Sequence, residues 1–337
     1  YWEDTKMEFS ATAGTAGGSL KALFEVRDGD NLENFKGKVT KADSYSLTVE
    51  NISIDNIKSL NLPDKDGKIT VNNISYSYDS WEAQVDAQGN IKSVTFNLSK
   101  DKAIADPEKT VAEGYLLNAG SAINARGIPY YMTQLNEFVR NFSEMFNQIE
   151  SKGQNLNGDT PPTFFEAITN TAKVYDFSES EAYSKLPDGQ TATINSSSNT
   201  YYRMTAANFS VNKDVMNDVS LFATSTDYVK TDSCDIVDEL KKLQSEKTVY
   251  RGDKAESFLE TIISNVSVDT EKAETYNKLY SNLEQTIANQ RTSVSGVDED
   301  EEALNLVKFQ YSYNMASKII SVMNQMLDKL INDTGVA

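Results

Sequence analysis

The sequence predicts an α+β multidomain protein: an elongated α-helical, coiled-coil-like rod with inserted antiparallel β domains. Three stretches that are remote in the sequence repeat apolar residues at steps of three and four, which is the period of packed helices. Two stretches between them alternate apolar and polar residues, as strands do. The predicted parts are helical rod segments at 1–36 and 127–165, an inserted β domain at 37–126, a second β-rich or irregular domain at 166–232, and a C-terminal helical rod at 233–337.

The first part of the chain combines a short helix with a strand-rich module. Ser19 precedes apolar residues at 20, 23, 24 and 26, which predicts a short amphipathic helix closing at Arg27–Asp30. Alternating residues at 45–49, 69–71, 74–78 and 94–98 predict strands. Turn-forming residues at 63–67 and 86–90 separate these strands, so an antiparallel module is expected.

A second helical stretch begins at Ile128, with Pro129 in its first turn. Its apolar residues step four, three, four, three, four along Tyr131, Leu135, Phe138, Phe142, Met145 and Ile149. Gly153 ends the pattern. A stripe of this kind is far more often packing core than the lining of a ligand groove, so core packing is expected.

Residues 170–231 are polar and strand-like, and Thr200–Met204 is predicted to be extended. A short helix is predicted at Asp235–Gln244. Arg251–Asp253 spells the integrin tripeptide RGD, but a helix-entry loop is the preferred interpretation of so short a match. The third heptad helix runs through Ala273, Tyr276, Tyr280, Leu283 and Ile287, and a loop is predicted at Ser293–Gly296.

The C-terminal stretch carries the clearest pattern of the chain. Asp298 is a candidate N-cap, and acidic residues follow it at the positive end of the helix dipole. Two adjacent apolar seams then share one helix, and we expect them to mediate subunit and helix packing. The first seam is Leu306, Phe309, Tyr313, Ala316, Ile320, Met323, Leu327 and Leu330; the second is Met315, Ile319, Val322 and Met326. A helix with two stripes has to be covered on more than one side.

Composition excludes several classes of function. The net charge of −18 argues against nucleic acid and anionic membranes as partners. The chain has no histidine, which removes His-based acid–base and nucleophile chemistry, and we expect no cofactor and no metal. Cys234 is the sole cysteine, so no intrachain disulfide forms.

Several ordered blocks resemble the flagellar hook-associated protein 1 family, the hook–filament junction proteins. Ser293–Asp298 (SVSGVD) is similar to the family's C-terminal S-V-S-G-V block, and residues 325–331 (QMLDKLI) to its closing E-M-L-D-x-L-L run. Residues 17–29 resemble its G-G-x-L…R-D block, and Ile128–Tyr131 its I-P-x-Y block. The blocks Leu156–Gly158 with Phe164–Phe165, and Thr205–Val211, resemble D-L-N-G…F-F and T-A-x-N-F-x-V.

The resemblance implies a non-enzymatic structural subunit that joins hook to filament outside the cell. It implies type III export without a cleavable signal peptide, and it implies as partners the chain itself, the hook protein and hook-associated protein 3. An export chaperone at the C-terminal helix is a further implied partner. Two departures stand out: the 31–126 stretch separates blocks that are neighbours in the family, and the family's N-terminal helices are expected to be missing from this sequence.

Two other hypotheses stay open. The chain is alternatively a sibling axial protein, flagellin or hook-associated protein 3, although the 17–29 and 156–165 blocks argue against this. The second hypothesis is that residues 37–126 or 170–231 form a carbohydrate-binding or carbohydrate-active module. In that module, Trp81, Tyr76 and Tyr78 would stack on a sugar. Aromatic residues on strands more often pack across the sheet.

Overall fold

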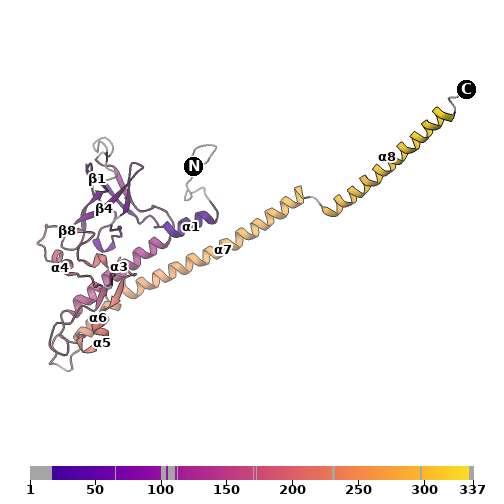
Figure 1. Cartoon of the computed structure of the whole chain (residues 1–337). Helices are drawn as coiled ribbons and strands as arrows, with labels where there is room; N and C mark the ends of the chain where they lie inside the picture. The colour runs from indigo at the N-terminus through magenta and orange to yellow at the C-terminus, as the bar shows by residue number, and fades with distance from the viewer. Residues whose placement is uncertain are drawn as a thin grey trace. The chain divides into compact units, whose positions relative to one another are not determined.

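The computed structural model describes residues 17–64, 66–99, 104, 111, 113–169, 171, 173–229, 232–296 and 298–333 (Figure 1). The chain divides into two compact units, Tyr1–Ile262 and Ile263–Ala337. The first unit contains every strand of the described residues and the helices that pack on them. The second unit consists of two long helices. Each unit is described by itself below.

Six antiparallel strands of the first unit form a closed sheet, a small barrel. The order is β3-β6-β1-β2-β5-β4, and a pairing of β3 with β4 closes it. A seventh strand, β8, pairs with the end of β4, with Ala83 opposite Ile194. The strands are β1 (Phe35–Asp43), β2 (Ser46–Glu50), β3 (Gly67–Val71), β4 (Ile74–Val85), β5 (Ile91–Leu98), β6 (Leu116–Ala119) and β8 (Ala192–Asn195).

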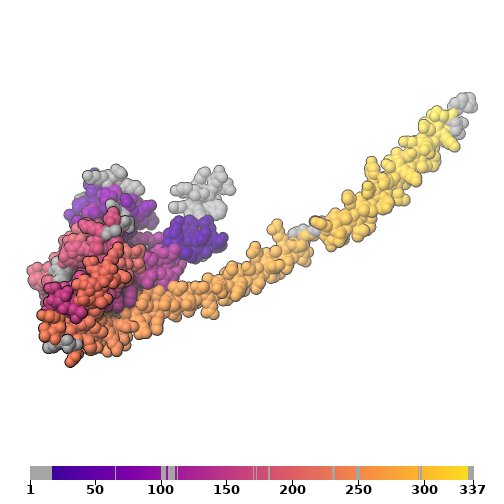
Figure 2. Space-filling view, turned by 60° about the horizontal axis from the view of Figure 1, so that its bottom comes forward, coloured from indigo at the N-terminus to yellow at the C-terminus, as the bar shows by residue number. Residues whose placement is uncertain are grey.

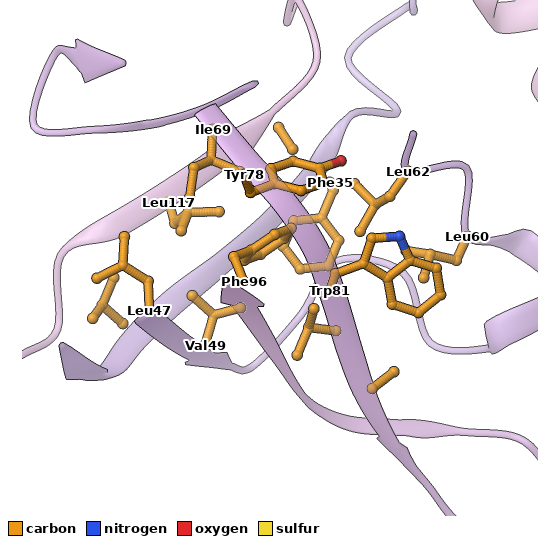
Figure 3. Close-up of a cluster of buried hydrophobic side chains, with 14 of the residues drawn as sticks. Phe35, Leu47, Val49, Leu60, Leu62, Ile69, Tyr78, Trp81, Phe96 and Leu117 are labelled. Atoms are coloured by element: carbon orange, nitrogen blue, oxygen red, sulfur yellow. The ribbon is translucent and has the colours of Figure 1, made fainter. Parts of the chain in front are cut away.

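The interior of this closed sheet is filled by one apolar cluster (Figure 3). Burial alternates along β2 and β5, as it must where one face of a strand points inward. The rings of Phe35 and Phe96 pack edge to face at 5.5 Å, and Trp81 meets Tyr202 at 4.9 Å and 81°. Tyr202 comes from outside the six strands, so the cluster also attaches a later segment of the chain.

Helix α3 (Ile128–Glu150) is the centre of the first unit. Three apolar clusters meet on its side chains: one with the 165–204 region, one with the start of α7 (Ala255–Ser295), and one with α6 (Asp235–Ser245). The aromatic stripe of α3 is therefore packing core, as predicted. The other described elements are α1 (Ser19–Asp28), η1 (Ile57–Ser59), β7 (Phe165–Ala167), α4 (Ser178–Ser184), η3 (Tyr201–Arg203), β9 (Phe209–Val211), α5 (Lys213–Asn217), η4 (Val219–Leu221), β10 (Thr248–Tyr250), β11 (Asp253–Lys254) and α8 (Glu299–Asp333).

A buried guanidinium joins α3 to the closed sheet. Arg140 is 2% exposed and donates hydrogen bonds to three backbone carbonyls, those of Lys58 (3.0 Å), Leu60 (2.6 Å) and Met204 (2.9 Å). Its guanidinium carbon also lies 4.5 Å from the centre of the Tyr202 ring. Each of these carbonyls would lose its partner without the arginine, so this side chain fixes the position of η1 and η3 on α3.

The α+β class is confirmed, whereas the elongated rod and the division into four parts stay predictions. The strands expected within 45–98 and the helices at 19–28, 128–150 and 235–245 are present. The prediction of an extended Thr200–Met204 is wrong. Residues 201–203 form the turn η3, because the Met204 N–H donates to the Tyr201 carbonyl (3.0 Å) while Arg140 holds the Met204 carbonyl.

Replacing Arg140 with methionine should lower the free energy of unfolding of the first unit by about 3 kcal/mol, because three buried carbonyls lose their donor. Urea unfolding, followed by the fluorescence of buried Trp81 in a Trp2→Phe background, measures this change. Arg27→Met is the control, since Arg27 pairs with Asp28 at the exposed end of α1. A loss no larger than that of the control would contradict the role given to Arg140.

The free energy of unfolding should depend on pH through the titration of Glu150, which is 1% exposed at the end of α3. Burial raises the pKa of its carboxyl to about 7 from 4.5, against an opposing effect of the Ala223 N–H. The folded state thus holds this proton more tightly than the unfolded chain. The free energy of unfolding therefore falls as the pH rises from about 4.5 to about 7.

Glu150→Gln should remove this decline. The variant is expected to be more stable than the parent by on the order of 2 kcal/mol at pH 8 and equally stable at pH 4. Urea titrations across this pH range test the difference, with exposed Glu246→Gln as the control. A variant that is less stable than the parent at pH 8 would refute the assignment.

Candidate assembly surface

Helix α8 begins where the sequence places its cap. The Asp298 carboxylate accepts hydrogen bonds from the N–H groups of Asp300 (3.0 Å) and Glu301 (3.4 Å). The first turn contains Glu299, Asp300, Glu301 and Glu302, whose charges favour the helix dipole. The predicted N-cap is therefore confirmed, and it fixes which residues share each face of the helix.

All twelve predicted seam residues lie on α8, the yellow segment in Figure 2, and the exposure of each side chain places it at the surface. Phe309 is 74% exposed and Tyr313 is 73% exposed. Soluble proteins seldom leave a continuous apolar surface of this length uncovered unless another chain or segment binds it. The structure thus brings the residues together on one helix, and their role in packing between subunits stays a prediction.

The third face of α8 is polar but almost uncharged. It presents Gln310, Asn314, Ser317, Ser321 and Gln325. Between residues 303 and 327 the only charged side chains are Lys308 and Lys318. A solvated helix normally carries many more charges, so this composition favours a helix that is surrounded by other polypeptide. No helix in the described part of the chain has the length and apolarity that a membrane crossing requires.

Helix α7 carries the third heptad pattern, and its seam is exposed beyond Ile262. Tyr276, Tyr280, Leu283 and Ile287 are all exposed. The loop predicted at Ser293–Gly296 is wrong for its first three residues, since α7 continues through Ser295. The helix stops at Gly296, whose N–H donates to the Thr292 carbonyl (2.7 Å) and where a Cβ would collide with that same oxygen.

The first two turns of α7 are anchored in the first unit. Ala255, Phe258 and Ile262 are buried against the apolar face of α3. The rings of Phe258 and Phe138 stack at 6.2 Å and 7°. These contacts fix where α7 starts, and the exposed seam follows immediately after them.

An ion-pair cluster holds the turn that precedes α7. Arg251 donates to both carboxylate oxygens of Glu33 (3.1 Å) and to Glu137 (3.1 Å). Burial acts to lower the pKa of Arg251, but the bonds to the two glutamates outweigh it and raise that pKa. Because its side chain is bound within the same unit, Arg251 does not present a free RGD motif. The helix-entry interpretation therefore holds.

Sequence reasoning missed the Glu33–Arg251–Glu137 cluster and the buried Arg140. The residues of the cluster are more than a hundred positions apart, and no spacing rule connects them. The apolar stripe of α3 predicted what that helix packs with, but nothing in the sequence showed that an arginine on its other side would be buried.

The other candidate sites are a cavity beside α3 and the aromatic residues of the closed sheet. A cavity of about 530 Å³ beside α3 is lined by Glu144, Glu150 and Glu166, of which Glu144 pairs with Lys58 at 2.7 Å. Within the described residues, no group of three or more His, Cys, Asp and Glu side chains has the geometry to hold a metal. Trp81 is fully buried with Tyr78, and Tyr76 is nearly so. The proposed sugar platform is therefore wrong.

Comparison with known proteins finds two similarities. Residues 288–333, the end of α7 and all of α8, match the family model described as flagellar basal body rod FlgEFG protein C-terminal. The chain is 21% identical over 341 residues to flagellar hook-associated protein 1 of Bacillus subtilis (strain 168). That alignment covers 99% of this chain and 56% of the relative, so the chain spans just over half of the relative's length.

The chain is thus similar over 99% of its length to a flagellar hook-associated protein, and α8 falls within a match to a flagellar rod domain. Together with a long helix whose apolar faces are exposed, these similarities support a structural role in the flagellum.

Substitutions at two neighbouring isoleucines test where the part of α7 that packs on α3 ends. Ile262 is 7% exposed, whereas Ile263 is 67% exposed. Ile262→Ala should lower the free energy of unfolding of the first unit by about 2–3 kcal/mol, because it opens a cavity against α3. Ile263→Ala should change it by less than about 0.5 kcal/mol. Urea unfolding and amide exchange of residues 255–262 measure both variants; equal effects would contradict the proposed boundary.

Proposed function

We propose that this chain is a structural subunit that joins the flagellar hook to the filament and assembles by helix–helix packing after type III export. The observation that carries the proposal is the exposed double seam of α8, which falls within the match to a flagellar rod domain. The relative that aligns with 99% of this chain is named a flagellar hook-associated protein. Apolar surface buried on assembly supplies the driving force for such packing.

The proposed mechanism uses the two seams for two different neighbours. Leu306, Phe309 and Ile320 lie on the first seam, and Met315 and Ile319 on the second. A helix that inserts between neighbours on both sides becomes part of a continuous rod, into which the α3 and α7 segments extend. In this arrangement the parts at 37–126 and 166–232 are the domains that project away from the rod.

The proposed partners are further copies of this chain, the hook protein and hook-associated protein 3, with an export chaperone at α8 before assembly. The proposed location is the extracellular flagellum, reached without a cleavable signal peptide. No catalytic role is proposed. The acidic net charge of −18 is unfavourable for nucleic acid and anionic membranes, so neither is proposed as a partner.

A sibling role as flagellin or hook-associated protein 3 is the less favoured alternative. Such a protein would share the C-terminal seams, because axial proteins pack through similar helices. The 99% coverage of this chain by a hook-associated protein 1 relative favours the junction role instead. The full-length protein should accordingly not form long filaments on its own.

A pair of matched double variants in the full-length protein tests this function. Ala316→Asp with Ile320→Asp places two carboxylates on the first seam, one turn apart. Packing would bury these charges without partners, at a cost of several kcal/mol in each subunit contact. Cells that carry the variant should lose attached filaments and release filament protein into the medium, as counted by electron microscopy and immunoblotting.

Ser317→Asp with Ser321→Asp is the control, because it adds the same charges at the same spacing on the polar face. Filaments should stay attached in these cells. If the seam variant retains its filaments as well as the control does, α8 is not the assembly surface.

A further inference from the structure

A cleft between the closed sheet and helix α3 contains a buried amide that no described residue satisfies. Asn34, directly before β1, is 6% exposed. Among the described residues, neither its side-chain nitrogen nor its side-chain oxygen has a hydrogen-bond partner. We propose that this cleft binds an extended peptide segment of a partner protein, and that the Asn34 amide pairs with a main-chain peptide group of that segment. The proposal uses only the first unit, so it does not depend on the flagellar role proposed above.

Two adjoining cavities form the cleft, and Asn34 lies in the wall of both. The first has a volume of about 480 Å³ and extends to Thr70 on β3 and Pro129 on α3. The second has a volume of about 420 Å³ and extends to Arg251, in the turn before α7. The lining residues that the two share are Glu33, Asn34, Ile54, Ser59 and Thr133. Because the cavities meet at Asn34, a ligand that fills the cleft has to pass this side chain.

An unpartnered buried amide lowers the stability of the first unit, because it has given up its hydrogen bonds to water. A second asparagine of the same cleft shows the contrast. Asn61 donates to the Ser59 carbonyl (3.2 Å) and accepts from the Asn136 amide (3.2 Å). Buried polar groups without a partner are few in folded proteins. Since Asn34 borders a cavity, its amide is placed to pair with a ligand there.

A peptide is the class of ligand that matches this amide. A side-chain amide offers an N–H donor and a carbonyl acceptor next to each other. In an extended chain the N–H and the C=O of one residue point to the same side, so they can form two hydrogen bonds with such an amide. Main-chain hydrogen bonds supply much of the affinity when proteins recognise extended peptides.

The lining of the cleft is less suited to sugars and nucleobases. Phe35 is the one aromatic residue among the described residues that line it. Phe35 is 3% exposed, and its ring packs on Phe96 inside the closed sheet at 5.5 Å (Figure 3). The cleft therefore offers no aromatic face on which a flat ligand or a sugar ring would stack.

Charge in the cleft favours a basic segment over an acidic one. Among the described residues that line it, carboxylates outnumber basic side chains: Asp28, Asp30, Glu33, Asp55 and Glu137 against Lys68 and Arg251. The resulting negative potential attracts a segment that carries lysine or arginine and repels phosphates and acidic peptides.

The stability of two leucine variants tests whether Asn34 is unpartnered in the free protein. Leucine has nearly the shape of asparagine, so Asn34→Leu should raise the urea midpoint of the first unit by about 0.3 M. Asn61→Leu is the matched control and should lower this midpoint, because it removes the hydrogen bonds to Ser59 and Asn136. Urea unfolding of the full chain, followed by Trp81 fluorescence in the Trp2→Phe background, measures both. If Asn34→Leu lowers the midpoint as Asn61→Leu does, Asn34 already has a partner, such as an ordered water, and the proposal is overturned.

Peptide binding to the ¹⁵N-labelled full chain tests the ligand class. The probe is acetyl-Ala-Lys-Val-Lys-Ala-amide, and the readouts are the NMR signals of the Asn34 side-chain amide and the Gly120 backbone amide, which line or border the cleft. The probe should shift both signals in a saturable way. Asn34→Leu should weaken its binding, read from the Gly120 signal, about tenfold, since two hydrogen bonds are lost.

Two analogues of the probe are the controls. The analogue with glutamate in place of lysine should bind more weakly, and so should the analogue whose backbone nitrogens are methylated, which has no N–H to donate. The proposal is overturned if the probe gives no saturable shift. It is also overturned if Asn34→Leu binds the probe as tightly as the parent, or if the methylated analogue binds as tightly as the probe.

Discussion

The apolar surface of α8 is the constraint on which the rest of the protein depends. An isolated helix gains little stability from its own hydrogen bonds, and most helices in proteins are stabilised by covering an apolar face. In α8 two of the three faces are apolar and exposed, Phe309 and Ile319 among them. Hydrophobic burial scales with the area removed from water, so the strongest interaction available to this chain is one it completes only when α8 is covered. The first unit buries its own apolar clusters, whereas the apolar residues of the long helices beyond Ile262 are exposed.

The first unit meets a different requirement, which is to hold the start of α7 in a defined place. Helix α3 does this by using opposite sides for different purposes. Its aromatic side packs on Phe258 and Ile262 at the start of α7, while Arg140 on the other side binds the carbonyls next to the closed sheet. Arg251 adds a polar clamp directly before α7 through Glu33 and Glu137. A displacement of the closed sheet would therefore be transmitted to the start of α7 through one rigid helix.

The sequence predicted those helices and strands whose patterns lie within a few neighbouring residues. It did not predict contacts between residues that are far apart in the chain. Heptad spacing identified α3, α7 and α8, and Asp298 was recognised as a cap, because period and capping are read within one or two turns. Alternation identified β2 to β5. The closure of the sheet through β3 and β4, and the addition of β8 from a hundred residues later, leave no local pattern. Thr200–Met204 was mistaken for a strand because its apolar residues are buried against Trp81 and α3 from a turn that pairs with no strand.

The low charge of α8 between residues 303 and 327 suits the proposed packing of an acidic chain. Copies that each carry −18 repel one another, and the repulsion grows steeply as they approach. In the proposed assembly, copies would come closest at α8, so charged residues there would oppose the apolar attraction most strongly. Between residues 303 and 327 the chain has only Lys308 and Lys318, both of which reduce the local negative charge. The acidic residues Asp298 to Glu302 instead gather at the helix start, where the backbone dipole offsets them. In that assembly, a neutral, hydrogen-bonding third face would let identical acidic molecules pack more closely than a charged helix surface would.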